Sequence, residues 1–190
     1  MKKILVYIMT FFIFTISISA ESKTIIVLGH PNYQNSRVNK ALIESLPADE
    51  NITIHNIAEI YPDGKINGEK ERKLLESYDR IIFQYPVHWY NMPAVMKNWW
   101  DSVFIPGWTN VGGTALKGKE MGIVATAGIP EENLKKLGFT IEDVAKPMEI
   151  VIKYIEGDYI GSVLMTGASQ LTEEKLNNTK AEYQKLILEK

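Results

Sequence analysis

Three short segments of this chain hold the side chains best suited to binding a ligand. The first is GHPNYQNSRVNKAL at residues 29–42, and the second is QYPVHWYNMPAVMKNWWDSVF at residues 84–104. The third is ATAG at residues 125–128. The first offers imidazole, hydroxyl and guanidinium groups, which suit phosphate. The other two combine aromatic side chains with small residues, a pairing that suits a flat heteroaromatic ligand.

The first segment leaves an apolar run and enters a helical pattern, so its last residues place backbone N–H groups at a helix N-terminus. Such a terminus suits phosphate through its unpaired amides and the positive end of the helix dipole. Ser36 can cap the helix or donate to a phosphate oxygen, and His30 and Arg37 can add charge. The segment matches neither the P-loop nor the G-x-G-x-x-G pattern. An ordinary N-cap serine with solvated neighbours is the alternative.

The second segment predicts a strand, a bend and a helix. Pro86 stops the strand, Val87–Tyr90 form the bend, Asn91 caps the following helix and Pro93 occupies its first turn. The four side chains of the bend cannot all turn inward. The bend therefore predicts exposed main-chain N–H groups with aromatic walls.

His88 and Tyr90 are the candidate catalytic residues of the bend. The alternative for His88 is a surface histidine. Beyond the bend, apolar residues at helical spacing are more typical of core than of a binding surface, and Trp100 on the adjacent face is expected at a rim or interface. The residues of the stripe are Met92, Val95, Met96, Trp99 and Val103.

Short apolar runs alternate with helical patterns along the chain. The runs predict strands at Thr24–Leu28, Ile52–Ile57, Arg80–Phe83, Glu120–Ala125 and Tyr159–Thr166. The helical patterns cover Ser36–Leu46, Gly68–Tyr78, Met92–Phe104, Ile141–Ile155 and Thr172–Leu188. This alternation predicts a doubly wound α/β domain with a parallel sheet and helices on both faces. Ligands of such sheets bind beyond the carboxyl ends of the strands, which directs attention to the loops after Leu28, Phe83 and Ala125.

Composition narrows the function classes. A formal net charge of -2 gives no basic excess, so nucleic acid is not an expected partner. The chain has no cysteine, which excludes disulfides and thiolate sites, and its three histidines have no ligand spacing. No metal site is expected.

The N-terminus has the form of a leader. Lys2 and Lys3 precede an uncharged run that ends in small residues, a pattern typical of a secretory signal peptide at residues 1–20. Residues 21–190 then form one domain. We expect an exported, periplasmic protein if the leader is cleaved, with a cytoplasmic location as the alternative.

The three segments, taken in order with PGW…GGTALKGK at residues 106–119, resemble the flavodoxin-like NAD(P)H:quinone oxidoreductases. The KefF-type ancillary proteins of glutathione-regulated potassium efflux are nearest, and the modulator-of-drug-activity and DT-diaphorase branches lie further off. The resemblance covers roughly residues 24–188 and extends to IYPDGKIN at residues 60–67. It implies a flavodoxin-like, five-stranded parallel sheet in the order 2-1-3-4-5.

The resemblance also implies a cofactor and its site. FMN, with FAD as the alternative, would bind through the residues His30, Ser36, Arg37, Val38, Asn39, Pro86, Val87, His88, Trp89, Tyr90, Thr126, Ala127 and Gly128. Hydride would pass from NAD(P)H through flavin N5 to a quinone or nitro-aromatic substrate in ping-pong order. Members of this family are commonly homodimers.

Two departures from the family pattern leave alternatives open. Residues 129–138 (IPEENLKKLG) lack the Tyr or His that many relatives use to stabilise charge on the reduced flavin, so Lys135 or Lys136 would have to supply that help. The leader is the second departure, because close relatives are cytoplasmic. A regulatory subunit of a potassium-efflux transporter and a flavin electron carrier are the alternative functions.

Overall fold

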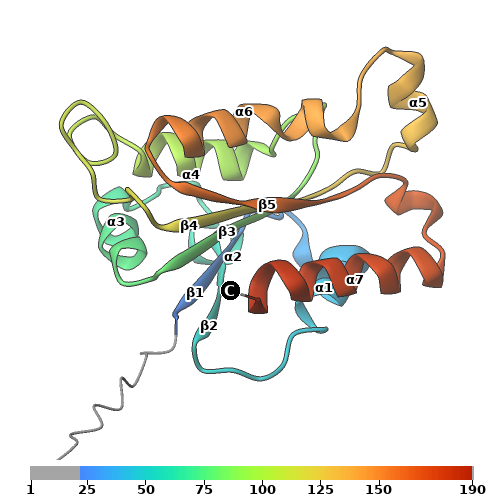
Figure 1. The fold of residues 1–190 in the computed structure, drawn as a ribbon, viewed down its shortest axis with the longest axis horizontal. Helices are drawn as coiled ribbons and strands as arrows, with labels where there is room; N and C mark the ends of the chain where they lie inside the picture. The colour runs from blue at the N-terminus through green and yellow to red at the C-terminus, as the bar shows by residue number, and fades with distance from the viewer. Residues whose placement is uncertain (1–21, 190) are drawn as a thin grey trace, which may run out of the picture.

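The computed structural model describes residues 22–189, in which strands and helices alternate (Figure 1). The strands are β1 (Thr24–Leu28), β2 (Ile52–Asn56), β3 (Arg80–Pro86), β4 (Glu120–Thr126) and β5 (Asp158–Met165). The helices are α1 (Arg37–Ile43), α2 (Ile57–Ile60), α3 (Gly68–Glu76), α4 (Ala94–Val103), α5 (Glu131–Lys136), α6 (Ile141–Tyr154) and α7 (Glu173–Leu188). Two short 3-10 turns, η1 (Tyr33–Asn35) and η2 (Ala168–Gln170), follow β1 and β5.

All five strands are parallel and lie in the order β2-β1-β3-β4-β5. This confirms the predicted fold class and strand order. The order reverses between β1 and β3, so the chain leaves these neighbouring strands toward opposite sides of the sheet. Their carboxyl ends therefore border a crevice where ligands of such folds bind.

Apolar side chains on both faces of the strands build two hydrophobic cores. Along β3, Ile81 and Phe83 point into the core beneath α2, α3, α4 and α6, while Ile82 points into the core beneath α1 and α7. The same alternation in β1 and β4 makes the central strands apolar at nearly every position, as expected of a parallel sheet covered on both sides.

The α4 region corrects three sequence predictions. Asn91 is not the helix cap: its side-chain oxygen accepts from the Met92 N–H, and Pro93 occupies the N-cap position instead of the first turn. Trp100 is not at a rim, because its ring is buried and lies 4.9 Å from that of Phe83, centroid to centroid. The helix is thus buried along a broader stripe than its spacing alone predicted.

Two helices were not predicted. The tetrapeptide α2 follows β2 without a break, and α5 occupies most of the segment after ATAG. Both are shorter than two turns, too short for a helical repeat of apolar residues to be recognised. Strand β3 also runs on through Pro86, which pairs with Thr126 at the very end of the strand. At that place the missing N–H of proline costs the ladder little.

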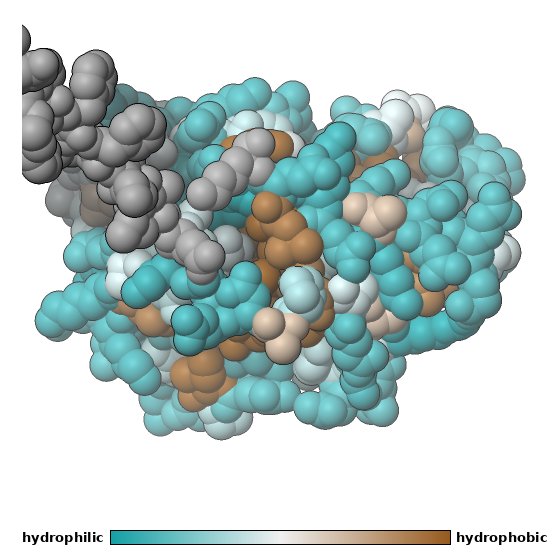
Figure 2. Space-filling view, turned by 60° about the horizontal axis from the view of Figure 1, so that its bottom comes forward, coloured by the Kyte–Doolittle hydropathy of each residue, from teal (hydrophilic) through white to brown (hydrophobic). Residues whose placement is uncertain are grey.

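The side of the molecule covered by α1 and α7 is predominantly hydrophilic, with hydrophobic residues in a central band (Figure 2). Within residues 22–189, none of the helices has the length and apolar character needed to cross a membrane. The predicted signal peptide at residues 1–20 lies outside the described residues.

Candidate active site at the β1–β3 switch point

The three segments singled out in the sequence converge on one hollow of about 280 Å³. It lies at the carboxyl ends of β1, β3 and β4, where the strand order reverses. Its lining consists of His30, Ser36, Arg37, Val38, Asn39, Pro86, Val87, His88, Thr126, Gly128 and Ala168. Ten of these eleven residues were predicted as cofactor ligands, and Ala168 of η2 was not.

Ser36 stands at the centre of the first wall. Its side chain caps α1, and its Oγ accepts from the backbone N–H of Asn39 and from Asn39 Nδ2, both at 3.2 Å. Because both contacts use the oxygen as acceptor, the hydroxyl hydrogen of Ser36 is left to donate. A hydroxyl oriented in this way suits an anionic oxygen.

A buried chain of side chains holds this wall in place. The Tyr183 hydroxyl of α7 donates to Gln84 Oε1 at 2.8 Å, and Gln84 Nε2 donates to Asn39 Oδ1 at 3.2 Å. Asn39 Nδ2 also donates to Thr126 Oγ1 at 3.0 Å. Four elements are thereby joined behind the hollow.

No sequence pattern pointed to Tyr183, because one tyrosine in an amphipathic helix is indistinguishable from core. Gln84, by contrast, was detectable as an amide inside an apolar strand, and both side chains are fully buried.

His30 and His88 face the hollow from two different segments. Nδ1 of His30 accepts from the backbone N–H of Asn32 at 3.1 Å, which assigns the ring hydrogen to Nε2 when the imidazole is neutral. Burial, and then the neighbouring His88, lower the pKa of His30 below its ordinary value. His30 is therefore a neutral donor at neutral pH.

Arg37 is the charged group of the site. Its guanidinium pairs with Glu173, at the start of α7, at 2.7 Å, and both side chains are more than half exposed. An exposed pair of this kind is worth roughly 0–1 kcal/mol, so Arg37 can exchange Glu173 for an anion at little cost.

The bend after β3 is a tight turn that carries two aromatic residues. His88 and Asn91 exchange backbone hydrogen bonds of 2.8 and 3.0 Å, and the residues between them, Trp89 and Tyr90, have φ values of 51° and 60°. Consecutive positive φ values are normally left to Asn and Gly, and each costs about 1–3 kcal/mol in bulkier residues.

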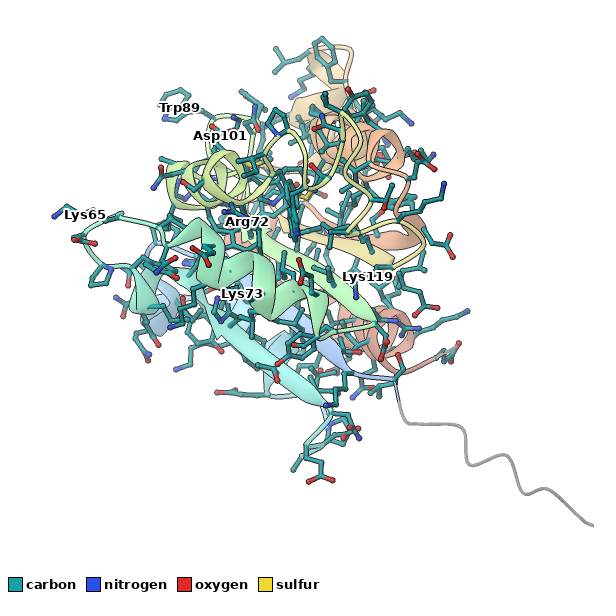
Figure 3. The ribbon with its side chains drawn as sticks, turned by 90° about the vertical axis from the view of Figure 1, so that its left-hand side faces the viewer. Lys65, Arg72, Lys73, Trp89, Asp101 and Lys119 are labelled. Carbon is teal, nitrogen blue, oxygen red and sulfur yellow. The ribbon has the colours of Figure 1, made fainter. Side chains whose placement is uncertain are left out.

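The turn directs both aromatic rings away from the hollow. Trp89 is 95% exposed and extends away from the body of the protein (Figure 3), and Tyr90 is about half exposed. Neither ring lines the hollow, so the bend contributes Pro86, Val87 and His88 to it and presents its aromatic rings on the outside.

The end of β4 forms the third wall. The backbone carbonyl of Thr126 accepts from the Val87 N–H at 2.8 Å, which fixes the bend to β4. Ala127, predicted as a ligand, is buried and donates its N–H to the Met165 carbonyl, so its amide is committed to the sheet. Beside Gly128 there is open space for a ligand, since a β-carbon there would meet no atom within 4 Å.

Comparison with known proteins identifies the family. The family described as having a flavodoxin-like fold matches residues 22–187. The chain belongs to the flavodoxin-like fold family. Among the curated relatives, an uncharacterized NAD(P)H oxidoreductase, YrkL of Bacillus subtilis, is 34% identical over 161 residues, which cover 83% of this chain and 92% of the relative. The ancillary protein KefG of the glutathione-regulated potassium-efflux system of Yersinia enterocolitica is 32% identical over 83% of this chain and 88% of its own.

Two solved structures agree with this placement. General stress protein 14 of Treponema denticola, in complex with FMN, superposes with a TM-score of 0.76 at 31% identity and covers 86% of this chain and 99% of its own. An NADPH-quinone reductase from P. pentosaceus gives a TM-score of 0.79 at 26% identity, with coverage of 88% and 99%. The predicted membership among flavodoxin-like NAD(P)H:quinone oxidoreductases is confirmed.

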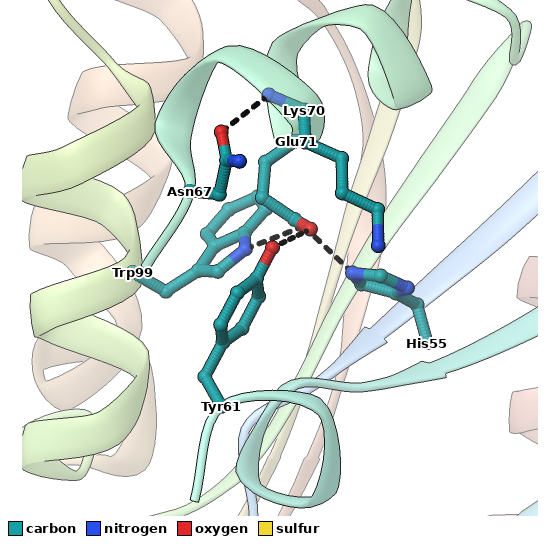
Figure 4. Close-up of polar contacts among 6 residues, drawn as sticks. All are labelled: His55, Tyr61, Asn67, Lys70, Glu71 and Trp99. Atoms are coloured by element: carbon teal, nitrogen blue, oxygen red, sulfur yellow. Dashed lines mark hydrogen bonds and ion pairs between the residues drawn. The ribbon is translucent and has the colours of Figure 1, made fainter. Parts of the chain in front are cut away.

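This flavodoxin-like oxidoreductase has a second polar cluster outside the hollow, built on the buried carboxylate of Glu71 in α3 (Figure 4). It contacts His55 Nε2 at 2.6 Å and accepts from the Tyr61 hydroxyl at 2.6 Å and from Trp99 Nε1 at 2.8 Å. Burial and the hydrogen bond to Glu71 raise the pKa of Tyr61 to about 12, so the tyrosine keeps its donor hydrogen. The cluster ties β2 and the loop after α2 to α4.

The two lysines proposed to assist the reduced flavin lie on α5, outside the hollow. Lys135 pairs with Glu131 at 2.6 Å, and Lys136 contacts Asn133 at 3.5 Å. Within residues 22–189, no cluster of three or more His, Cys, Asp or Glu side chains could hold a metal ion.

Proposed function

We propose that this protein is an FMN-dependent oxidoreductase that takes hydride from NAD(P)H and reduces a quinone or a nitro-aromatic compound. The observation that carries the proposal is the convergence of His30, Ser36–Asn39, Pro86–His88, Thr126 and Gly128 on one hollow at the switch point. The complex of one structural relative with FMN supports it, as do the oxidoreductase names of other relatives.

The residues of the hollow fit FMN. The hydroxyl of Ser36, the neutral imidazole of His30 and the exchangeable guanidinium of Arg37 supply donors for a phosphate. The backbone of Pro86–His88 and the open space beside Gly128 suit the close approach of a flat ring. Bound FMN supplies the capacity to accept two electrons as hydride and pass them on.

In the balanced reaction, NAD(P)H, a quinone and one proton give NAD(P)⁺ and a hydroquinone. The protein binds and orients the reactants. His88 is the candidate to hold a proton at the hollow, while Tyr90 stands on the outer side of the turn and is the candidate to contact the substrate.

Steady-state kinetics test this function. NAD(P)H oxidation should depend on added quinone, and double-reciprocal plots at several quinone concentrations should be parallel, as expected of ping-pong exchange through one site. Intersecting lines, or oxidation that ignores the quinone, would contradict the proposal.

The match to KefG favours a second candidate, an ancillary subunit of a potassium-efflux transporter. In that role the flavin-binding protein would dock on a transporter, and turnover would be secondary. Co-purification of the protein with such a transporter from membranes would support this role. A protein that reduces quinone and does not co-purify with the transporter would contradict it.

Assembly and location are part of the proposal. We propose a homodimer, because several large apolar side chains are exposed on the α4–α6 side, among them Ile150 and Tyr154 of α6. We also propose that residues 1–20 are a cleaved leader and that the protein is exported, with a cytoplasmic oxidoreductase as the alternative. N-terminal sequencing of the mature protein decides between them.

A further inference from the structure

An apolar groove of about 420 Å³ lies between α5 and α6, next to the bend after β3. We define the α5–α6 groove by its lining, which is Tyr90, Leu134, Leu137, Phe139, Asp143 and Val144. Its volume falls in the range of about 300–1,000 Å³ that is typical of small-molecule sites. Leu137 and Phe139 are both more than half exposed, so their apolar surface is available to a ligand.

The groove and the hollow of the candidate active site lie on either side of the bend after β3 and share no lining residue. Tyr90 forms one wall, two residues beyond His88 of the hollow. Its floor residue Leu134 packs in one cluster with Ala127 at the end of β4, and Val87 of the bend packs against the same cluster. The groove is therefore adjacent to the bend, within reach of a side chain on a molecule whose reactive ring lies there.

The lining determines the chemistry of what enters. It contains no basic side chain, so the groove does not suit the phosphates of NAD(P)H. Its one charged group, Asp143, accepts from the backbone N–H of Thr140 at 2.8 Å and from the Thr140 hydroxyl at 3.1 Å. This carboxylate is committed to capping α6 and would repel an anion. A neutral hydrocarbon chain fits the remaining surface.

We propose that the α5–α6 groove binds the apolar side chain of the electron acceptor, so that the protein prefers quinones that carry a hydrocarbon arm over bare quinone rings. The inference rests on the proposed quinone reductase function and specifies its substrate class. It also gives a role to residues 129–138, where the expected Tyr or His is replaced by a segment that contributes Leu134 and Leu137.

The test compares two naphthoquinones with the same ring, one of which carries a short isoprenoid chain. The FMN-loaded protein should have a KM for the chain-bearing quinone about tenfold lower, as expected when a few methylene groups leave water. Leu137→Gln should raise that KM about fivefold and leave the KM for the bare ring within about twofold. Leu188→Gln is the matched control, because Leu188 is also partly exposed but lies at the end of α7.

Binding without turnover gives a second measurement. Quenching of flavin fluorescence by the chain-bearing quinone, with no NAD(P)H present, should show the same loss of affinity in Leu137→Gln. Equal affinity for the two quinones in the wild-type protein would overturn the inference while leaving the reductase function intact. A second result would also overturn the inference. If light scattering showed that Leu137→Gln separates a dimer, and the quinone preference did not change, the groove would be a contact between subunits. Failure of NAD(P)H to reduce the flavin would count against the proposed function itself.

Discussion

The hydroxyl of Ser36 is shared between the fold and the site. Its oxygen caps α1 by accepting from Asn39, and the hydrogen that remains is available to a ligand. The sequence offered two alternative roles for Ser36, as an N-cap or as a hydrogen-bond donor to phosphate. The two roles are compatible, because the cap uses the oxygen as an acceptor and leaves the hydroxyl hydrogen to donate.

We expect Ser36→Ala to weaken FMN binding by roughly ten- to a hundredfold, because a hydrogen bond to a charged oxygen is worth about 1.5–3 kcal/mol. Flavin fluorescence during titration of the apoprotein measures this. Asn67→Ala is the matched control, since Asn67 caps α3 through the same kind of bond and does not line the hollow. Both variants should lose about 1 kcal/mol of stability, and only the first should lose FMN affinity. Equal affinities would remove Ser36 from the phosphate site.

Single residues also mark the limits of prediction. The chemistry of His30, Ser36 and Arg37 could be recognised from their types and from the strand that precedes them. The orientation of Trp89 and Tyr90 could not, because bulky residues rarely adopt positive φ and no pattern announces it. The bend was predicted to combine main-chain N–H groups with aromatic walls, and in the structure Trp89 and Tyr90 do not belong to the lining of the hollow.

At the scale of elements, the carboxylate of Glu71 fixes α3, α4 and the loop after α2 to one another. Burial alone would raise the pKa of this carboxyl, and the hydrogen bonds from His55, Tyr61 and Trp99 outweigh it, so the pKa lies below its ordinary value. A carboxylate with a lowered pKa stabilises the folded state above its unfolded pKa of about 4.5, and this contribution is lost as the pH falls through the folded pKa.

Urea unfolding at a series of pH values should reveal this contribution. We expect Glu71→Gln to lower the free energy of unfolding by about 2 kcal/mol at pH 7 and to flatten its decline below about pH 4.5. Glu69→Gln serves as the control on the same helix, because Glu69 is exposed and its ion pair with Lys73 lies on the surface. A decline in acid that is as steep in Glu71→Gln as in the wild type would show that another group is responsible.

The long strands were predictable as continuous apolar runs, and the long helices were predictable from the helical spacing of their apolar residues. The predictions that were missed or wrong concern short elements and helix ends. Helices α2 and α5 are too short to show a helical repeat, and the N-cap of α4 is Pro93 and not Asn91. The Glu71 cluster was hidden for another reason. Its hydrogen bonds join residues that are 10, 16 and 28 positions apart, and nothing in a single sequence pairs them.

For the whole molecule, the switch point of the sheet determines where the site lies. The alternation of apolar runs and helical patterns predicted a doubly wound domain, and the strand order implied by the family resemblance is the one observed. Assembly is a separate matter, since a single chain shows only which apolar surfaces remain exposed. Ile150 and Tyr154 lie one turn apart on the outer face of α6 and are more than half exposed.

We expect Ile150→Glu to convert a dimer to a monomer. In a symmetric dimer the substitution would bury one unpaired carboxylate from each subunit in the interface, and burying an unpaired charge is costly. Light scattering of the purified protein measures the change. Ile60→Glu provides a control at an exposed isoleucine of α2. A wild-type protein that is already monomeric would refute the proposed homodimer, as would a dimer unaffected by Ile150→Glu.

One FMN per chain, held in the hollow at the switch point and reduced by NAD(P)H, is the condition on which the proposed activity depends. Anaerobic stopped-flow mixing of the reconstituted protein with NADH and with NADPH is the decisive experiment. We predict about one FMN per chain, bleaching of the flavin by at least one of the two donors, and recovery of its colour when a quinone is added. A protein that stays colourless after incubation with FMN and with FAD, or a bound flavin that neither donor bleaches, would refute the proposed activity.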